Sequence, residues 1–251
     1  PSRGSASARS RATSPAAGSC RPGAETPVGP SAPYRLPDSI FWALVAASVL
    51  FCLVHAARGS IRRAAAPGGA AGAAERHSAF QRFFHWANAV TVAILLVSGL
   101  AIYGSPALGD LGSTTAFWFA WHLWISPAFA ALLVAHVLYE YRVPGHIDEM
   151  WPAGATPGKY DRAQIFFHWA VALNLAALVL TGAVLWKPLR ALLPVRLLGL
   201  GWDFVFLNRV FHGLFTGTLV ALLLAHVYLA LLVRSNWPRL SSMALGSREA
   251  R

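Results

Sequence analysis

Five long apolar runs, separated by short polar stretches, dominate the hydrophobic pattern of the chain. They lie near residues 39–55, 83–103, 116–139, 165–186 and 206–233. Coiled as helices, such runs are about long enough to span the ~30 Å hydrocarbon layer of a bilayer. Tryptophan side chains stand at run ends, where interfacial aromatic residues belong: Trp86, Trp118, Trp169, Trp186 and Trp237. The pattern therefore predicts five transmembrane helices.

The stretches around these runs divide the chain into segments. Residues 1–37 are rich in Ser, Ala, Pro, Gly and Arg, a composition typical of a disordered polar tail. Residues 38–57 are predicted to form an extra N-terminal transmembrane helix, and 58–79, with its Gly and Ala runs, a flexible linker. We expect 80–240 to form one four-helix domain and 241–251 a C-terminal tail. The predicted fold class is all-α, an integral membrane helical bundle.

Composition supports the membrane class. Hydrophobic residues make up 56% of the chain and charged residues only 12%, with a mean hydropathy of +0.49. A soluble domain needs more charge to cover its surface. The net charge of +11 comes from single basic residues at run ends without any nucleic-acid-binding motif, so we expect lipid and no nucleic acid as a partner. The two cysteines, Cys20 and Cys52, are too few to ligate an iron–sulfur cluster.

The distribution of Lys and Arg predicts the orientation. Twelve fall on the side that receives the loops after the first, third and fifth runs, and four on the opposite side. Cytoplasmic loops carry the excess of positive charge, which places the first side inside. The five arginines of the N-terminal tail fall on the opposite side, so the count of Lys and Arg becomes twelve against nine. Export of the tail behind a cleaved signal would remove the conflict, and we therefore expect it on the outer, periplasmic side.

Part of the chain repeats. The segment Phe83 to Trp86 (FFHW) recurs at Phe166 to Trp169, an offset of 83 residues. A second correspondence has an offset of 90 and relates two histidines of the third run to two of the fifth. The second and third runs therefore look like one helix pair, and the fourth and fifth like its copy.

Six histidines lie within the last four predicted helices: His85, His122, His136, His168, His212 and His226. Histidine is costly inside a bilayer and usually has a function there. His212 and His226, fourteen residues apart, would stand about 21 Å apart along one helix and within ~40° of one face. Histidine is a standard axial ligand of haem iron, whereas zinc sites use compact clusters that the sequence lacks. We expect two non-covalent b-type haems, one in each leaflet.

The orientation partly predicts how the histidines pair. His122 and His212 lie near the outer surface, and no other helical histidine does, so they form the one available outer pair. Four candidates compete for the two positions near the inner surface: His85, His136, His168 and His226. The internal repeat favours His136 with His226, but these considerations do not decide the inner pair.

Several short motifs lie between Phe80 and about Gly246. They are Gln81 to Trp86 with Ser98-Gly99, His122, Gly158-Lys159-Tyr160 followed by Gln164, Thr181-Gly182 with Trp186-Lys187-Pro188, and His212 with His226-Val227-Tyr228. In these motifs the chain resembles the γ (cytochrome b) subunit of membrane-bound respiratory formate dehydrogenases. The 158–164 loop is the most specific match, because hydrogenase and thiosulfate-reductase cytochromes share the histidine pattern.

The resemblance implies a ligand set and a quinone site. It implies that His122 and His212 bind the outer haem, and that His85 and His226 bind the inner one. A quinone (menaquinone or ubiquinone) would bind beside the loop residues Lys159, Tyr160, Asp161 and Gln164, although Asp161 stands where the family usually has Asn. Two arginines could pair with haem propionates or serve only as topology anchors: Arg82 and Arg162.

Two histidines depart from that family. His136 and His168 stand where it has apolar residues, so they are alternative inner ligands or groups that surround the haem or quinone. Helix 38–57 and the tail also lie outside the family's four-helix core.

The resemblance further implies partner subunits, one with iron–sulfur clusters and one with a Mo- or W-pterin, in the bacterial inner membrane and in a complex that could form a higher oligomer. The chain itself shows no dinucleotide or pterin site, so primary oxidation would belong to the partners. The alternatives are a hydrogenase or thiosulfate-reductase cytochrome and, in another class, a haem-free membrane anchor or transporter.

Overall fold

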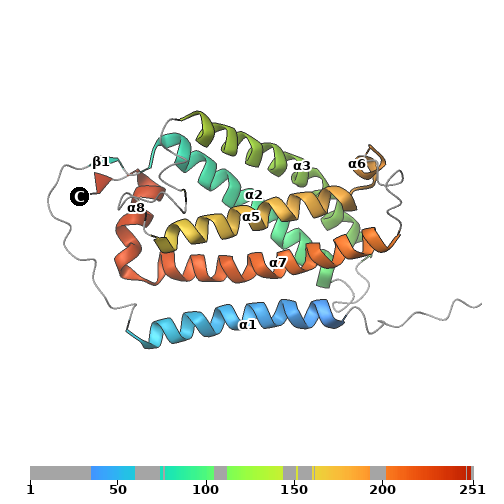
Figure 1. The fold of residues 1–251 in the computed structure, drawn as a ribbon, viewed down its shortest axis with the longest axis horizontal. Helices are drawn as coiled ribbons and strands as arrows, with labels where there is room; N and C mark the ends of the chain where they lie inside the picture. The colour runs from blue at the N-terminus through green and yellow to red at the C-terminus, as the bar shows by residue number, and fades with distance from the viewer. Residues whose placement is uncertain are drawn as a thin grey trace, which may run out of the picture.

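A computed structural model describes residues 35–59, 74–75, 77–104, 112–143, 162–192, 202–246 and 248–249, with single positions 151 and 160. Among the described residues, five helices are long, and they lie roughly side by side (Figure 1). They are α1 (Arg35–Ala57), α2 (Ala79–Gly104), α3 (Gly112–Arg142), α5 (Arg162–Leu185) and α7 (Trp202–Leu231). Within the described ranges, these five are long and apolar enough to cross a membrane. They coincide with the five predicted runs.

Shorter elements close the two ends of the bundle. Helix α6 (Lys187–Leu192) follows α5 directly, while the 3-10 turn η3 (Arg234–Asn236) leads from α7 into α8 (Trp237–Leu245). Two strands of two residues, β1 (Ala74–Glu75) and β2 (Arg248–Glu249), pair antiparallel. The stretches that the sequence analysis treated as linker and C-terminal tail therefore contain some regular structure. Apart from this strand pair, the regular elements that the structure describes are all helical.

The start of α2 is fixed by its own side chains. Ser78 Oγ accepts a hydrogen bond from the backbone N–H of Gln81 at 3.2 Å, and Gln81 Oε1 accepts one from the N–H of Ser78 at 3.1 Å. This reciprocal capping box satisfies two amide groups that a helix start leaves without partners. It places His85 two turns into the helix.

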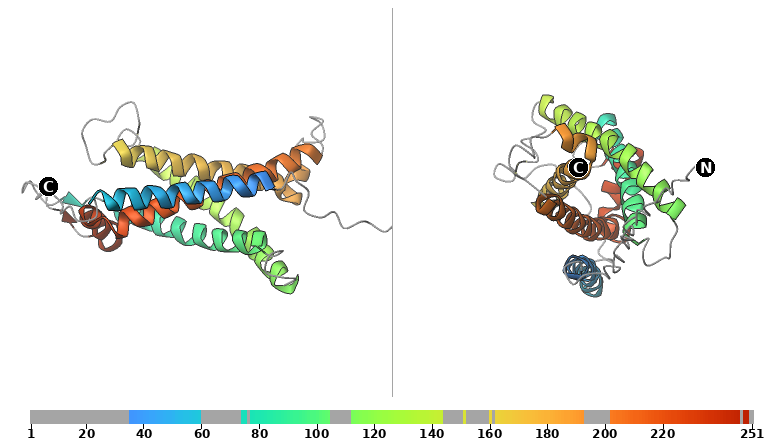
Figure 2. Two further views of the ribbon diagram at one scale, coloured as in Figure 1. Left: turned by 90° about the horizontal axis from the view of Figure 1, so that it is seen from below. Right: turned by 90° about the vertical axis from the view of Figure 1, so that its right-hand side faces the viewer.

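Helices α2, α3, α5 and α7 form the four-helix bundle, in which α2 packs on α3 and α5 on α7. The end-on view in Figure 2 shows α1 outside this group, beside α7. Each of the four helices contributes one residue to the buried core: Val92, Phe129, Leu175 and Leu219. Val92 and Leu175 differ by 83 in number, and Phe129 and Leu219 by 90. The core is therefore built from two pairs of positions that the internal repeat relates.

Helix α1 runs parallel to α7 and touches it along one stripe. Phe41 lies against Gly217, where an added Cβ would approach the phenyl ring to 2.9 Å. Two turns further along α1, Ser48 Oγ donates a hydrogen bond to the carbonyl of Ala221 at 2.7 Å. His55 Nδ1 and the Tyr228 hydroxyl share a hydrogen bond of 2.8 Å. The three α1 positions are seven residues apart, so one face of α1 meets α7.

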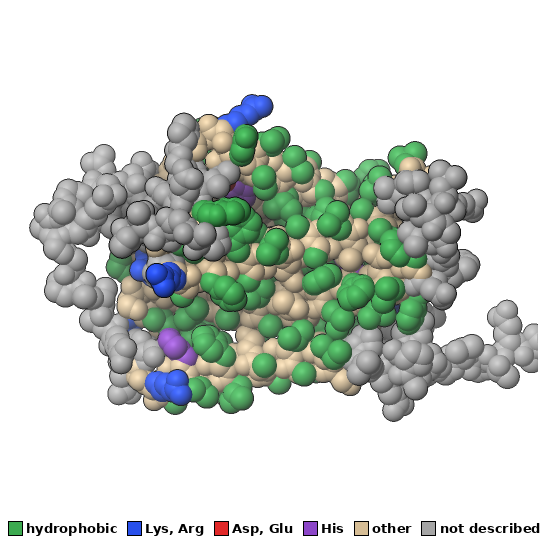
Figure 3. Space-filling view, in the orientation of Figure 1, with side chains coloured by type: hydrophobic (Ala, Val, Ile, Leu, Met, Phe, Trp, Pro, Cys, Tyr) green, Lys and Arg blue, Asp and Glu red, His purple; other side chains and the backbone are tan. Residues whose placement is uncertain are grey.

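The outer surface of the bundle is apolar. Large side chains such as Phe166 (76% exposed), Leu180 (69%) and Trp124 (79%) have no protein neighbour to cover them. Hydrophobic side chains spread over the described face in Figure 3, and the few Lys and Arg visible there lie mainly toward its left-hand end. Water does not tolerate so large an apolar surface, whereas hydrocarbon does. The predicted fold class, an all-helical membrane bundle of four helices plus an extra N-terminal one, is confirmed.

Candidate haem-binding site

Two histidines from different helix pairs face each other at the end of the bundle near α6. The imidazole centres of His122 on α3 and His212 on α7 are 6.4 Å apart, and their planes lie at 81°. Both rings project inward. We name them the 122/212 pair.

Each ring of the 122/212 pair is held by a hydroxyl from the neighbouring helix. Ser98 Oγ on α2 lies 2.9 Å from Nδ1 of His122, and Thr181 Oγ1 on α5 lies 2.9 Å from Nδ1 of His212. Both hydroxyls donate their own hydrogen to a backbone carbonyl within their helix, at 3.1 and 2.8 Å. A hydroxyl has one hydrogen, so the network assigns the proton of each imidazole to Nδ1. Nε2 then keeps a free lone pair for a metal.

A second pair lies at the other end, near α8. The ring centres of His85 on α2 and His226 on α7 are 6.3 Å apart, with planes at 54°. Aromatic side chains support both rings. Phe167 stacks on His226 at 5.4 Å, and Trp86 meets His85 edge-on at 5.3 Å. We name these residues the 85/226 pair.

Both spacings suit a hexacoordinate metal between two imidazoles. An imidazole nitrogen bonds a metal at about 2.0 Å, so two rings on opposite faces of one iron have their centres about 6 Å apart. The measured 6.4 and 6.3 Å fit this arrangement. Among the described residues, no group of three or more His, Cys, Asp or Glu is placed to hold a metal ion. Two imidazoles fit the axial positions of haem, in which the porphyrin supplies the other four ligands.

The apolar core separates the two pairs. Leu219 lies seven residues from both His212 and His226, and Phe129 lies seven residues from His122. Seven residues correspond to about 10 Å along a helix and return to nearly the same face. The bundle therefore offers two histidine pairs, one toward each end, with packed side chains between them.

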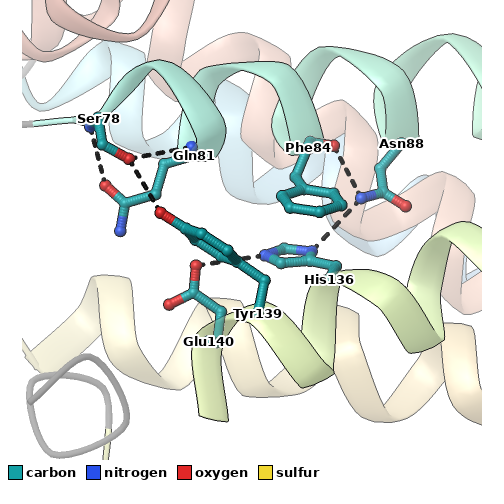
Figure 4. A network of polar contacts seen from close by, with 7 residues as sticks. All are labelled: Ser78, Gln81, Phe84, Asn88, His136, Tyr139 and Glu140. Carbon is teal, nitrogen blue, oxygen red and sulfur yellow. Dashed lines mark hydrogen bonds and ion pairs between the residues drawn. The ribbon is translucent and has the colours of Figure 1, made fainter. Parts of the chain in front are cut away.

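His136 does not join either pair. Its ring stacks on Phe84 at 5.0 Å, with planes only 5° apart. Its Nδ1 lies 3.4 Å from Nδ2 of Asn88 and its Nε2 lies 3.7 Å from a carboxylate oxygen of Glu140 (Figure 4). Both ring nitrogens thus lie beside other polar side chains, whereas the internal repeat had nominated this residue as the partner of His226.

The same polar network continues from His136 toward the start of α2. The Tyr139 and Ser78 hydroxyls are 3.4 Å apart, beside the capping box of α2 (Figure 4). His168, the repeat counterpart of His85, is exposed and meets Trp169 edge-on at 6.2 Å. It interacts electrostatically with His136 and Glu140. His136 and His168, the two histidines absent from the family pattern, therefore interact electrostatically with each other, and His136 does so with His85 of the 85/226 pair.

The proposed quinone loop is described only in part. Tyr160 lies against His77, with ring centres 6.2 Å apart, and Gln164 is half-buried in the first turn of α5. Lys159 and Asp161 lie outside the described residues. The structure therefore brings Tyr160 and Gln164 to the end of the bundle that holds the 85/226 pair.

The two arginines expected near a haem have different surroundings. Arg82 donates a hydrogen bond from Nη1 to the carbonyl of His77 at 2.7 Å. Its guanidinium also covers Gly246, where an added Cβ would lie 2.7 Å from Nη1 and where φ is +69°. Glycine suits both the close approach and the left-handed backbone at this helix end. Arg162 is exposed at the start of α5.

Ser98 and Thr181 belong to motifs of the sequence, but no role was predicted for them. The signal was present, because the two positions differ by 83, like the two FFHW segments. Ser126 and Thr216 form another such pair, with an offset of 90. They donate hydrogen bonds to the carbonyls of His122 and His212, at 2.6 and 2.8 Å.

An apolar four-helix bundle with two facing histidine pairs defines a membrane cytochrome b. Residues 76–246 match the sequence profile of prokaryotic cytochrome b561. The chain belongs to this family, as a multi-pass membrane cytochrome b that binds haem b and transfers electrons. None of the curated proteins compared with the chain matches it.

Proposed function

We propose that the chain carries electrons across the membrane from an iron–sulfur partner subunit to a quinone, within a formate dehydrogenase complex. The observation that carries the proposal is the pair of facing imidazoles toward each end of one bundle, at 6.4 and 6.3 Å. In this proposal the 122/212 pair lies toward the outer surface and binds one haem b. The 85/226 pair lies toward the cytoplasm and binds the second. Bound haem supplies the one-electron redox chemistry, and the protein supplies ligands, spacing and surroundings.

The residues of this chain have distinct tasks in that route. The four histidines hold two redox centres about 21 Å apart along α7. The packed core between them excludes water. At the inner end, Tyr160 and Gln164 belong to the loop that we propose binds the quinone head group, together with Lys159 and Asp161. An electron that moves inward across the membrane travels toward the negative side. This step costs about 2.3 kcal/mol per 100 mV of membrane potential, so the route stores energy.

The resemblance in the 158–164 loop supports the formate dehydrogenase assignment over a hydrogenase or thiosulfate-reductase complex. Affinity purification of the full chain in mild detergent, followed by mass spectrometry, tests it. We expect an iron–sulfur subunit and a Mo- or W-pterin subunit to copurify, with two haems per chain in a pyridine haemochrome assay. A hydrogenase large subunit in their place would refute the assignment, and a haem-free preparation would refute the whole proposal.

A further inference from the structure

We propose that Ser98 and Thr181 are positioning residues for the axial ligands His122 and His212, and that their hydroxyls lower the reduction potential of the haem held there. The inference rests on the proposed ligation of haem by these two histidines. It assigns a role to two side chains that touch the ligands but not the iron.

Burial makes the two hydroxyls significant. The side chain of Ser98 is fully buried and that of Thr181 is 8% exposed. A buried polar group must find a partner, because an unpaired one is costly in hydrocarbon. Each hydroxyl satisfies its hydrogen within its own helix and accepts a second hydrogen bond, 2.9 Å long, from the imidazole across the interface. Neither ring can rotate without breaking that bond.

The hydrogen bond also changes the ligand. An acceptor on Nδ1–H draws the proton toward itself and leaves more electron density on the ring, which makes Nε2 a stronger donor. A stronger donor stabilises the ferric state more than the ferrous state, so the reduction potential falls. Because both axial ligands carry such an acceptor, the two contributions act in the same direction.

The internal repeat argues that the hydroxyls are tied to the histidines. Ser98 and Thr181 are repeat counterparts, as are the two histidines that they hold. Each hydroxyl is followed by a glycine, at 99 and 182, whose added Cβ would touch Cε1 of the ring at 3.4 Å in both cases. Not every polar position on these helices is the same in both copies, although Gln81 and Gln164 are, as are His85 and His168. The counterpart of Thr91 is Asn174, which donates to the carbonyl of Phe215 instead.

Redox titration of the intact haem-loaded protein, followed by optical spectroscopy, tests the proposal. Ser98→Ala and Thr181→Val should each raise the midpoint potential of one haem, and the double variant should raise it further. The other haem should keep its potential. Thr91→Val is the matched control, because its hydroxyl bonds only to carbonyls of its own helix, at 2.8 and 3.1 Å. It should leave both potentials unchanged.

A conservative variant separates the hydroxyl from side-chain size. Ser98→Thr keeps the acceptor and should retain the wild-type potential, since the copy already has Thr at this place. If Ser98→Ala loses the haem and Ser98→Thr retains it, the positioning role is supported. Loss of the haem in both variants, or unchanged potentials in Ser98→Ala and Thr181→Val, would overturn the proposal.

His122→Ala distinguishes this failure from a failure of the proposed function. The haem signal that disappears in this variant identifies the one whose potential should respond to Ser98→Ala. If His122→Ala keeps both haems, the ligand assignment itself is wrong. If it loses one haem while the hydroxyl variants do not shift the potential of that haem, only the positioning role is wrong.

Discussion

The two histidine pairs have nearly the same separation but different support. The rings of the 122/212 pair each bond to a hydroxyl at 2.9 Å. The rings of the 85/226 pair contact aromatic side chains, and the described residues make no hydrogen bond to their nitrogens that the structure records. Hydrogen bonds fix the tautomer and the donor strength of an imidazole, whereas aromatic contacts fix only its orientation. Equal geometry therefore does not imply equal chemistry at the two ends.

Symmetry differs between the ends as well. His122 and His212 are repeat counterparts, so the 122/212 pair is symmetric with respect to the two helix pairs. His85 and His226 are not counterparts, and the repeat relates them to His168 and His136 instead. Those two residues belong to a polar region with Glu140. The pair at one end is symmetric with respect to the repeat, whereas the facing histidines at the other end come from positions that the repeat does not relate.

The largest effect expected is the loss of a whole redox centre. His212→Ala should remove the haem of the 122/212 pair, and His226→Ala that of the 85/226 pair, because one remaining imidazole holds haem weakly. A pyridine haemochrome assay should fall from two haems per chain to one. His55→Ala, in another transmembrane helix, should keep two. A content of one haem per chain in the wild-type protein would show that the two histidine pairs are not both haem sites.

The next test concerns the composition of the asymmetric end. His85→Ala should abolish the haem of the 85/226 pair, because His85 lies 6.3 Å from His226. His136→Ala should keep both haems and at most shift one potential, because the two ring nitrogens of His136 lie beside Asn88 and Glu140. Optical spectra of the two variants decide the matter. The reverse result would make His136 the ligand and would restore the symmetry of the repeat at this end.

A smaller effect should separate electron delivery from haem binding. Gln164→Ala is expected to slow quinol formation several-fold while leaving both haem spectra nearly unchanged, since Gln164 lies in the proposed quinone loop. Ser241→Ala in α8, at the same end of the bundle, is the control and should reduce quinone at the wild-type rate. Loss of haem without a separate quinone defect would show that the loop is structural. The measurement is steady-state quinone reduction by the intact complex.

The smallest effect expected lies outside the four-helix bundle. Ser48→Ala removes one hydrogen bond between α1 and α7 and should lower the free energy of unfolding by about 0.6 kcal/mol, the average for such bonds in a membrane. Thermal unfolding in detergent measures it. Haem content and both potentials should stay unchanged. This result would show that the difference between the two ends arises within α2, α3, α5 and α7. A shifted potential would show that α1 contributes to one of the sites.

Much of the architecture could be predicted from sequence because single-helix properties determine it. Apolar length predicted the five spans, and the spacing of His212 and His226 predicted two sites on one helix. The choice among inner histidines depends on how α2 is rotated against α3 and α7, which no single helix records. The repeat nominated His136, but Asn88 of α2 lies 3.4 Å from its ring, a contact between helices that the sequence of α3 alone does not show. The role of a small hydroxyl such as Ser98 could not be predicted, because it depends on a partner in another helix.

The docking of α1 has a consequence for the order in which the chain assembles. Ser48 and His55 find their partners 173 residues later, in the last span. At about 5–20 residues per second, a ribosome needs on the order of 10–35 seconds to synthesise that stretch. During this interval Ser48 and His55 lack these partners, and a polar side chain without a partner in hydrocarbon is costly. Among the five described spans, α1 therefore waits longest for its packing partner, and it can dock onto α7 only after α7 has been made.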